Sequence, residues 1–133
     1  MKYYLDTNII VYALNGKYPA VERHFQSVPA MSIAVPSIVL AEIEYGARKS
    51  RDYAKTIAQY RKFTGIFEPV PFSDAASVCY GKIRAELEEQ GQVIGADDML
   101  IAATALADES VLVTHNVGEF SRIEGLKVED WTE

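Results

Sequence analysis

The sequence predicts an α/β fold in which helices cover both faces of a parallel β-sheet. Short apolar segments alternate with longer segments of helical periodicity, which is the pattern of β-α-β units. The run VLV at 111–113 is apolar without alternation, and such runs are typical of strands buried on both faces. A chain of 133 residues is long enough to bury a proper core, so we expect one domain over residues 1–133.

The first half of the chain contains two candidate strands and four candidate helical segments. Ser37 follows Pro36 and is a good N-cap, because its hydroxyl can accept a backbone N–H bond at the start of a helix. In chain order we expect a strand at 2–6, a helical or irregular segment at 7–14, a helix at 19–27, a strand at 31–35, and helices at 37–49 and 52–64.

The second half adds three candidate strands and two longer helices. Ser73 can cap the first of these helices and Gly91 can end it. The buried face of that helix is an apolar stripe of Ala76, Cys79, Ile83 and Leu87. In chain order we expect a strand within 67–72, a helix at 73–90, a helix that ends near 107, a strand at 110–114, a short turn or helix at 119–120 and an edge strand at 126–128.

Composition excludes several classes of protein. A single cysteine, Cys79, rules out an internal disulfide and a multi-cysteine zinc site. No apolar run reaches the ~20 residues of a membrane span, and the first strand begins too early for a signal peptide to precede it. We therefore expect a cytoplasmic protein without a membrane partner.

The net charge of −6 is unusual for a nucleic-acid-binding protein, whose binding face is normally basic. The charges are unevenly distributed, however. Between Arg48 and Lys62 lie six bases and one acid, Asp52, which gives this segment a local charge of +5. A segment of this kind can hold RNA phosphates.

Acidic residues stand at the ends of several predicted elements. Asp6 directly follows the first strand, Glu42 lies beside the apolar stripe of its helix, and Glu119 follows the strand at 110–114. Each acid has an ordinary explanation when it is taken alone. An Asp after a strand is often a helix cap, and a helix Glu is often a solvated surface residue.

Asp97 and Asp98 stand at the head of an otherwise apolar helix. If this helix begins at Asp98, Asp97 is its N-cap and accepts backbone N–H bonds. Asp98 then lies in the first turn, where the helix dipole stabilises an anion. Asp98 also shares the apolar side of the helix with Ile101, Ala102 and Ala105.

The ends of parallel strands converge at one edge of the sheet, where ligands bind, so these acids can share one cleft. Two unit charges ~4 Å apart repel by about 4 kcal/mol at an effective dielectric of ~20. Such a cluster persists only with raised pKa values or with a bound cation. Oxygen ligands select hard ions such as Mg²⁺ or Mn²⁺, and Mg²⁺ commonly shares its shell with phosphate oxygens.

Four ordered motifs resemble those of a known family. The stretches LDTNIIVYAL, AEIEYG, IGADDMLIAATA and VTHNVGEFSRIEGLKVEDW look like those of PIN-domain ribonucleases, and more narrowly of VapC-type toxins of toxin–antitoxin pairs. The likeness runs from Lys2 to Trp131. It implies a PIN-like three-layer fold with a central five-stranded parallel sheet, and a Mg²⁺- or Mn²⁺-dependent endoribonuclease. It also implies homodimerisation and a small VapB-type antitoxin that blocks the site.

The resemblance assigns roles to particular residues. It implies that the acids Asp6, Glu42, Asp98 and Glu119 are the catalytic and metal-binding residues. Supporting polar roles fall to Thr7, Asn8 and Asn116. Asp97 has no fixed counterpart and is a further candidate ligand. In relatives with such motifs the substrate is often a transfer RNA, although nothing in these residues shows that.

Other residues have both a functional and a structural interpretation. The bases that can contact RNA are Arg48, Lys49, Arg51, Lys55 and Arg84. Arg84 can instead pair with Glu88 one helical turn away. Tyr45, Tyr53 and Tyr60 can stack on bases, although helical packing explains them more simply. His115 is not needed as a base if a metal activates the water.

Competing functions are less compatible with the motifs. A haloacid-dehalogenase-like phosphatase requires D-x-D-x-T after the first strand, and this chain has Asn8 where the second Asp belongs. A receiver-like regulator requires an acid pair after that strand and a late Lys, and neither is evident. The remaining alternative is a degenerate PIN fold that binds RNA or protein without catalysis; the retained acids argue against it.

Overall fold

The computed structural model describes all residues, 1–133. Five strands form one sheet in which every neighbouring pair is parallel, in the order β3-β2-β1-β4-β5. The strands are β1 (Tyr3–Leu5), β2 (Ile33–Pro36), β3 (Glu68–Val70), β4 (Val111–Val113) and β5 (Lys127–Glu129). The predicted parallel sheet, its five strands and its edge strand at the C-terminal end are confirmed.

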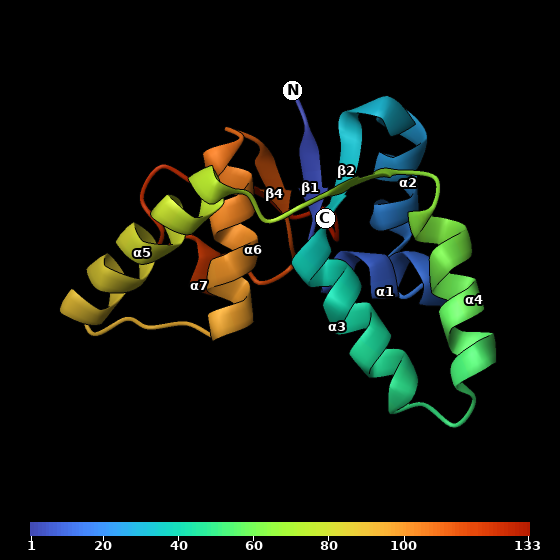
Figure 1. Ribbon diagram of the computed structural model, residues 1–133. Helices are drawn as coiled ribbons and strands as arrows, with labels where there is room; N and C mark the ends of the chain where they lie inside the picture. Colours follow the sequence, from blue (N-terminus) through green and yellow to red (C-terminus); the bar gives the residue numbers. More distant parts are fainter.

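Seven α-helices and one 3-10 turn connect and cover the strands (Figure 1). They are α1 (Thr7–Asn15), α2 (Pro19–Ser27), the 3-10 turn Ala30–Ser32, α3 (Ser37–Arg48), α4 (Tyr53–Thr64), α5 (Asp74–Glu89), α6 (Ala96–Ala107) and α7 (Val117–Phe120). The segment 7–14, for which helix and irregular structure were both open, is helical. No helix is long and apolar enough to cross a membrane.

The two faces of the sheet are covered by different helices. Successive strand residues point to opposite faces, and in β1 Tyr3 packs against Trp131 while Tyr4 hydrogen-bonds Asp108, the residue that ends α6. Trp131 also stacks on His24 of α2. Helix α2 therefore lies on the Tyr3 face and α6 on the Tyr4 face.

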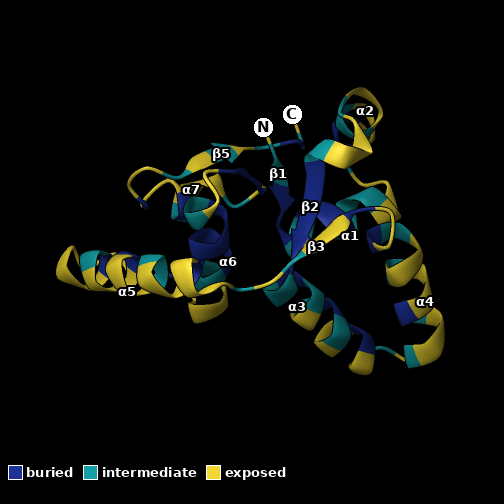
Figure 2. Ribbon diagram, turned by 45° about the horizontal axis from the view of Figure 1, so that its top comes forward, coloured by how far each residue is buried: buried dark blue, intermediate teal, exposed yellow.

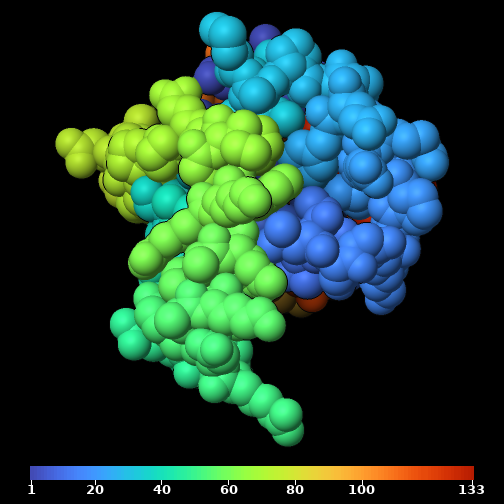
Figure 3. Space-filling view, turned by 90° about the vertical axis from the view of Figure 1, so that its right-hand side faces the viewer, coloured from blue at the N-terminus to red at the C-terminus, as the bar shows by residue number.

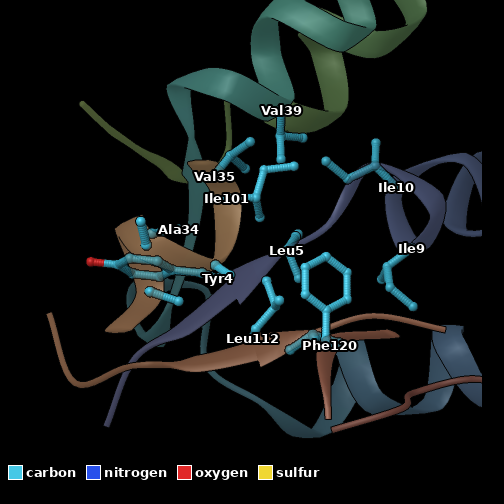
Figure 4. Close-up of a cluster of buried hydrophobic side chains, with 14 of the residues drawn as sticks. Tyr4, Leu5, Ile9, Ile10, Ala34, Val35, Val39, Ile101, Leu112 and Phe120 are labelled. Atoms are coloured by element: carbon cyan, nitrogen blue, oxygen red, sulfur yellow. The ribbon is translucent and has the colours of Figure 1, made fainter. Parts of the chain in front are cut away.

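The core is continuous through the sheet. Every residue of β2 and β4 is buried, as expected for strands covered on both faces. Figure 4 shows Ile10 of α1, Val39 of α3 and Ile101 of α6 converging near Val35 of β2. Helix α6 is mostly buried, whereas α5 is exposed along its outer side (Figure 2).

The observed helix ends can be compared with the capping residues predicted from the sequence. Ser73 caps α5 as predicted, with its hydroxyl accepting from the Ala76 N–H at 3.1 Å, and Gly91 beyond the helix has a φ of +66°. The N-cap predicted at Ser37 is wrong, because Ser37 is already helical and Pro36 holds the cap position without a side-chain bond. Pro36 belongs to β2 and already has the extended backbone that an N-cap requires.

Helices α3 and α4 form a hairpin that extends away from the sheet (Figures 1 and 3). Asp52 caps α4 by accepting from the Lys55 N–H. Ile43 and Ala47 of α3 and Ile57 of α4 are buried. The free tip of the hairpin carries the basic segment that begins at Arg48.

Candidate active site

The acids lie at the carboxyl edge of the sheet, where the strand order reverses. From β1 the chain passes to β2 and β3 on one side, and it later returns to β4 on the other side of β1. Such a switch point leaves a crevice between the ends of the two central strands. Asp6 follows β1 and Thr114 follows β4, so both residues stand at this crevice.

Asp6 is the most deeply buried of the acids, with 4% of its surface exposed. It caps α1, and its Oδ1 accepts from the Thr7 N–H at 2.9 Å. Its Oδ2 accepts from the Thr114 hydroxyl at 2.7 Å and from Asn8 Nδ2 at 3.3 Å. Burial raises the pKa of Asp6, while the bonds from Thr114 and Thr7 act in the opposite direction. The helix-cap explanation and the site explanation therefore both apply to this residue.

Glu42 is tied to the first helix across the crevice. The Thr7 hydroxyl donates to Glu42 Oε1 at 2.5 Å, so Thr7 contacts one of the candidate ligands. Burial raises the pKa of Glu42, the Thr7 bond lowers it, and the charges of Asp6 and Asp97 raise it further. Glu42 is thus half-buried and hydrogen-bonded, and it is not a fully solvated helix acid.

The negative charges of several other acids act on Asp98. Its pKa is raised from 3.8 to about 6, first by burial and then by the charges of Asp6, Glu42, Glu119 and Asp97. The carboxylate accepts no hydrogen bond from the protein, and its Oδ2 lies 3.5 Å from the position that a Cβ on Gly95 would occupy. Asp98 is therefore under the influence of four other acidic charges and has no protein donor to stabilise its own charge.

The N-cap expected at Asp97 is wrong. Helix α6 begins at Ala96, and Gly95 holds the cap position without a side-chain bond. The first helical bond runs from the Met99 N–H to the Gly95 carbonyl. Asp97 and Asp98 are both in the first turn, where the helix dipole favours anions, but Asp97 is exposed and Asp98 is half-buried.

Thr114 is a site residue that the sequence did not reveal. Besides donating to Asp6, its hydroxyl oxygen accepts from the Asn116 N–H at 3.0 Å and from Asn8 Nδ2 at 3.4 Å. Asn116 in turn donates from Nδ2 to Glu119 Oε2 at 2.9 Å. The signal in the sequence was the motif VTHNVGEF, in which Thr114 precedes Asn116 and Glu119, although Thr114 itself was assigned to the strand at 110–114. Through this network Asn8 hydrogen-bonds Asp6 and Asn116 hydrogen-bonds Glu119.

The donor set fits a hydrated Mg²⁺ or Mn²⁺ ion. No Lys or Arg pairs with the acids, because the ion pairs of the protein are Lys2–Glu68, Arg61–Glu44, Arg84–Glu88 and His115–Asp130. No three His, Cys, Asp or Glu side chains are arranged to hold one ion directly. Mg²⁺ commonly takes only one or two carboxylates and keeps several waters. The carboxylates of the site have no Lys or Arg partner, so their oxygens can serve as ligands of such an ion.

The remaining candidates form no ion pair with the site acids. Arg84 has its Nε 3.8 Å from Glu88 and donates to the Tyr80 hydroxyl, so the predicted pair within its own helix is present. The other bases, Arg48, Lys49, Arg51 and Lys55, lie at the exposed tip of the α3–α4 hairpin. His115 donates its backbone N–H to Asn8, while its ring hydrogen-bonds Asp130, which is not one of the candidate site acids.

This combination of sheet and site is that of a PIN nuclease, and comparison with known proteins supports that class. A family model described as PIN domain matches residues 3–126. Ribonuclease VapC2 of Rickettsia felis is 41% identical, with 98% of each chain covered. The tRNA(fMet)-specific endonuclease VapC of Shigella flexneri is 34% identical, with 99% of each covered. The chain belongs to the VapC ribonucleases of the PIN-domain family.

Solved structures agree with this assignment. The crystal structure of VapBC2 from Rickettsia felis bound to a promoter DNA fragment matches with a TM-score of 0.91 at 39% identity, over 98% of this chain and 99% of that one. DNA-bound VapBC from Salmonella typhimurium matches with a TM-score of 0.92 at 34% identity, over 98% of each chain. The assignment sets aside the phosphatase and receiver alternatives.

Proposed function

We propose that this VapC ribonuclease cleaves RNA internally with a hydrated Mg²⁺ or Mn²⁺ ion bound in the crevice of Asp6, Glu42, Asp98 and Glu119, partly through water. The observation that carries the proposal is Asp98, a half-buried carboxylate that has no paired cation and whose pKa is raised by burial and by the charges of Asp6, Glu42 and Glu119. A bound divalent ion supplies a Lewis acid that activates water and neutralises charge on the phosphate. The exposed Asp97 is a lesser ligand or none.

The chain's own residues position the reacting groups. Asp6 has both oxygens engaged by Thr7, Asn8 and Thr114, so its orientation is fixed before substrate binds. Glu119 has Oε2 engaged by Asn116, and its Oε1 can orient water or accept a proton. Fixed orientation of this kind lowers the reorganisation needed during catalysis.

The substrate and the partners are proposed from the relatives. The Shigella flexneri relative is named for the initiator transfer RNA, and transfer RNA is the substrate we propose here. Structures of related chains are complexes with VapB, and we propose that a small VapB-type antitoxin inhibits this chain. We also propose that the active form is a homodimer.

The decisive experiment compares RNA cleavage by the wild type and by Asp98→Asn, on purified transfer RNA, with Mn²⁺, Mg²⁺ or excess EDTA. We expect cleavage only for the wild type with metal. A second measurement follows Tm during Mn²⁺ titration, where the wild type gains stability and Asp98→Asn gains much less. Full cleavage in EDTA would refute the metal-dependent mechanism.

The same experiment tests the alternative of a non-catalytic binding module. That alternative requires the wild type to bind RNA or protein without cleavage at any metal concentration. A Tm that does not respond to Mn²⁺ would support it as well. The absence of any cation partner for the acids argues for the enzyme, because a binding module has no use for such repulsion.

A further inference from the structure

Helix α3 extends the acidic site outward along one of its sides. Consecutive helix residues are rotated by about 100°, so residues three and seven positions apart share a side of a helix. Glu42, Tyr45 and Lys49 have this spacing within α3 and at its C-terminal end. The side that brings Glu42 to the crevice therefore presents Tyr45 and Lys49 between the crevice and the tip of the hairpin.

Tyr45 is the most solvent-exposed of the three tyrosines in the hairpin. Its exposed fraction is 66%, which is high for a large aromatic residue. Tyr53 is half-buried, donates its hydroxyl to Glu44 and lies under the guanidinium of Arg48. Tyr60 is half-buried and lines a cavity of about 320 Å³ with Thr7 and Glu42. Packing explains Tyr53 and Tyr60, but it does not explain Tyr45.

A positive charge accompanies this ring. The Lys49 ammonium lies 5.1 Å from the centroid of the Tyr45 ring. Gly46, one position on from Tyr45, is exposed, and nothing lies within 4 Å of the position that its Cβ would take. The neighbouring Arg48 lies instead 3.7 Å from the Tyr53 ring centroid, on the side of α3 that faces α4. An accessible aromatic ring, a cation and open space therefore occur together on the Glu42 side.

We propose that Tyr45 and Lys49 bind a nucleotide of single-stranded RNA next to the cleaved phosphate, with the base stacked on Tyr45 and a phosphate held by Lys49. An aromatic ring stacks on any base, and a basic side chain follows the backbone. The negative charge of RNA complements the basic tip and not the acidic crevice, so this subsite supplies attraction that the acids cannot. The inference rests on the proposed function and adds the residues that hold the flanking nucleotide.

The test measures binding of a short single-stranded RNA containing 2-aminopurine, with all variants made in the Asp98→Asn background so that RNA stays intact. We expect Tyr45→Ala to weaken binding by roughly 5- to 100-fold and to reduce the quenching of 2-aminopurine, while Tyr45→Phe preserves both. We expect Lys49→Gln to weaken binding and to lower the salt dependence by about 0.7 in the logarithmic slope. Lys82→Gln, which removes the same charge from the exposed side of α5, is the matched control and should bind within about twofold.

Three outcomes would overturn the subsite. Binding by Tyr45→Ala equal to that of its parent would remove the stacking role, and equal losses for Lys49→Gln and Lys82→Gln would leave only a diffuse charge effect. Loss of self-association by Tyr45→Ala in sedimentation would assign this face to a second copy of the chain. If Asp98→Asn itself cleaves like the wild type, the proposed function fails first. If only the wild type cleaves and the Tyr45 variants bind alike, the subsite alone fails.

Discussion

The Thr114 hydroxyl donates a hydrogen bond of 2.7 Å to Asp6 Oδ2, which joins the carboxyl ends of β1 and β4. The two residues are 108 positions apart in the chain. The hydroxyl oxygen also accepts from the Asn116 N–H at 3.0 Å, and Asn116 holds Glu119. One buried hydroxyl therefore links two acids of the site.

The first prediction concerns this link. We expect Thr114→Val, which keeps the shape but removes the donor, to lower Mn²⁺ affinity and cleavage by about 10- to 100-fold, as is usual when a partner of a metal ligand is lost. Thr114→Ser should restore most of both. Isothermal titration with Mn²⁺ gives the affinity without relying on turnover. Wild-type affinity in Thr114→Val would show that Asp6 does not need this bond.

The second prediction concerns pH and stability. The pKa of Asp98 is about 6 in the folded protein, against its ordinary value of 3.8. The folded state therefore binds this proton more tightly, so the contribution of Asp98 to the free energy of unfolding falls as pH rises from about 4 to about 6 and stays lost above it. We expect metal-free Asp98→Asn to melt above the wild type at pH 7.5, with a smaller difference near pH 4. A large fall in Tm for the variant would mean that this carboxylate is structural.

The third prediction concerns metal affinity, which depends on protonation of the same residue, Asp98. A metal ligand must be deprotonated to bind, so we expect the affinity of the wild type for Mn²⁺ to fall as pH drops below about 6. Asp6 and Glu42, whose pKa values are also raised by burial, should act in the same direction. Titrations at a series of pH values measure the effect. An affinity that stays constant between pH 5 and pH 7.5 would contradict it.

The sheet and the position of the site could be predicted because both depend on local signals. Apolar runs identify the strands, and the rule for parallel sheets directs attention to the residues that follow them. Asp6 and Glu119 were found in this way, since each lies just beyond a short strand. The strand order itself was not predicted, because it depends on which strands pair across long stretches of chain.

The contacts within the site could not be predicted for the same reason. The bond between Thr7 and Glu42 spans 35 positions and that between Thr114 and Asp6 spans 108, so neither leaves a local pattern. The start of α6 was placed at Asp98 because Asp is a common cap. The helix instead begins at Ala96, and Gly95 holds the cap position without a side-chain bond, so no capping side chain marks the start in the sequence.

The last prediction separates the two neighbouring acids of α6. Both lie in the first turn and share the favourable dipole, but residues one position apart point about 100° away from each other. Asp98 is the half-buried one, and its pKa responds to Asp6, Glu42 and Glu119, whereas Asp97 is exposed to solvent. We therefore expect Asp97→Asn to keep much of the cleavage rate and Asp98→Asn to lose it by ~10²-fold or more. Both variants remove one negative charge from the same helix turn, so each controls for the change in overall field that the other makes. The measurement is the cleavage rate of both on the same transfer RNA at saturating Mn²⁺. If Asp97→Asn is the less active of the two, the metal is bound at the exposed side of the helix start, and the crevice beside Asp6 is not where the phosphate reacts.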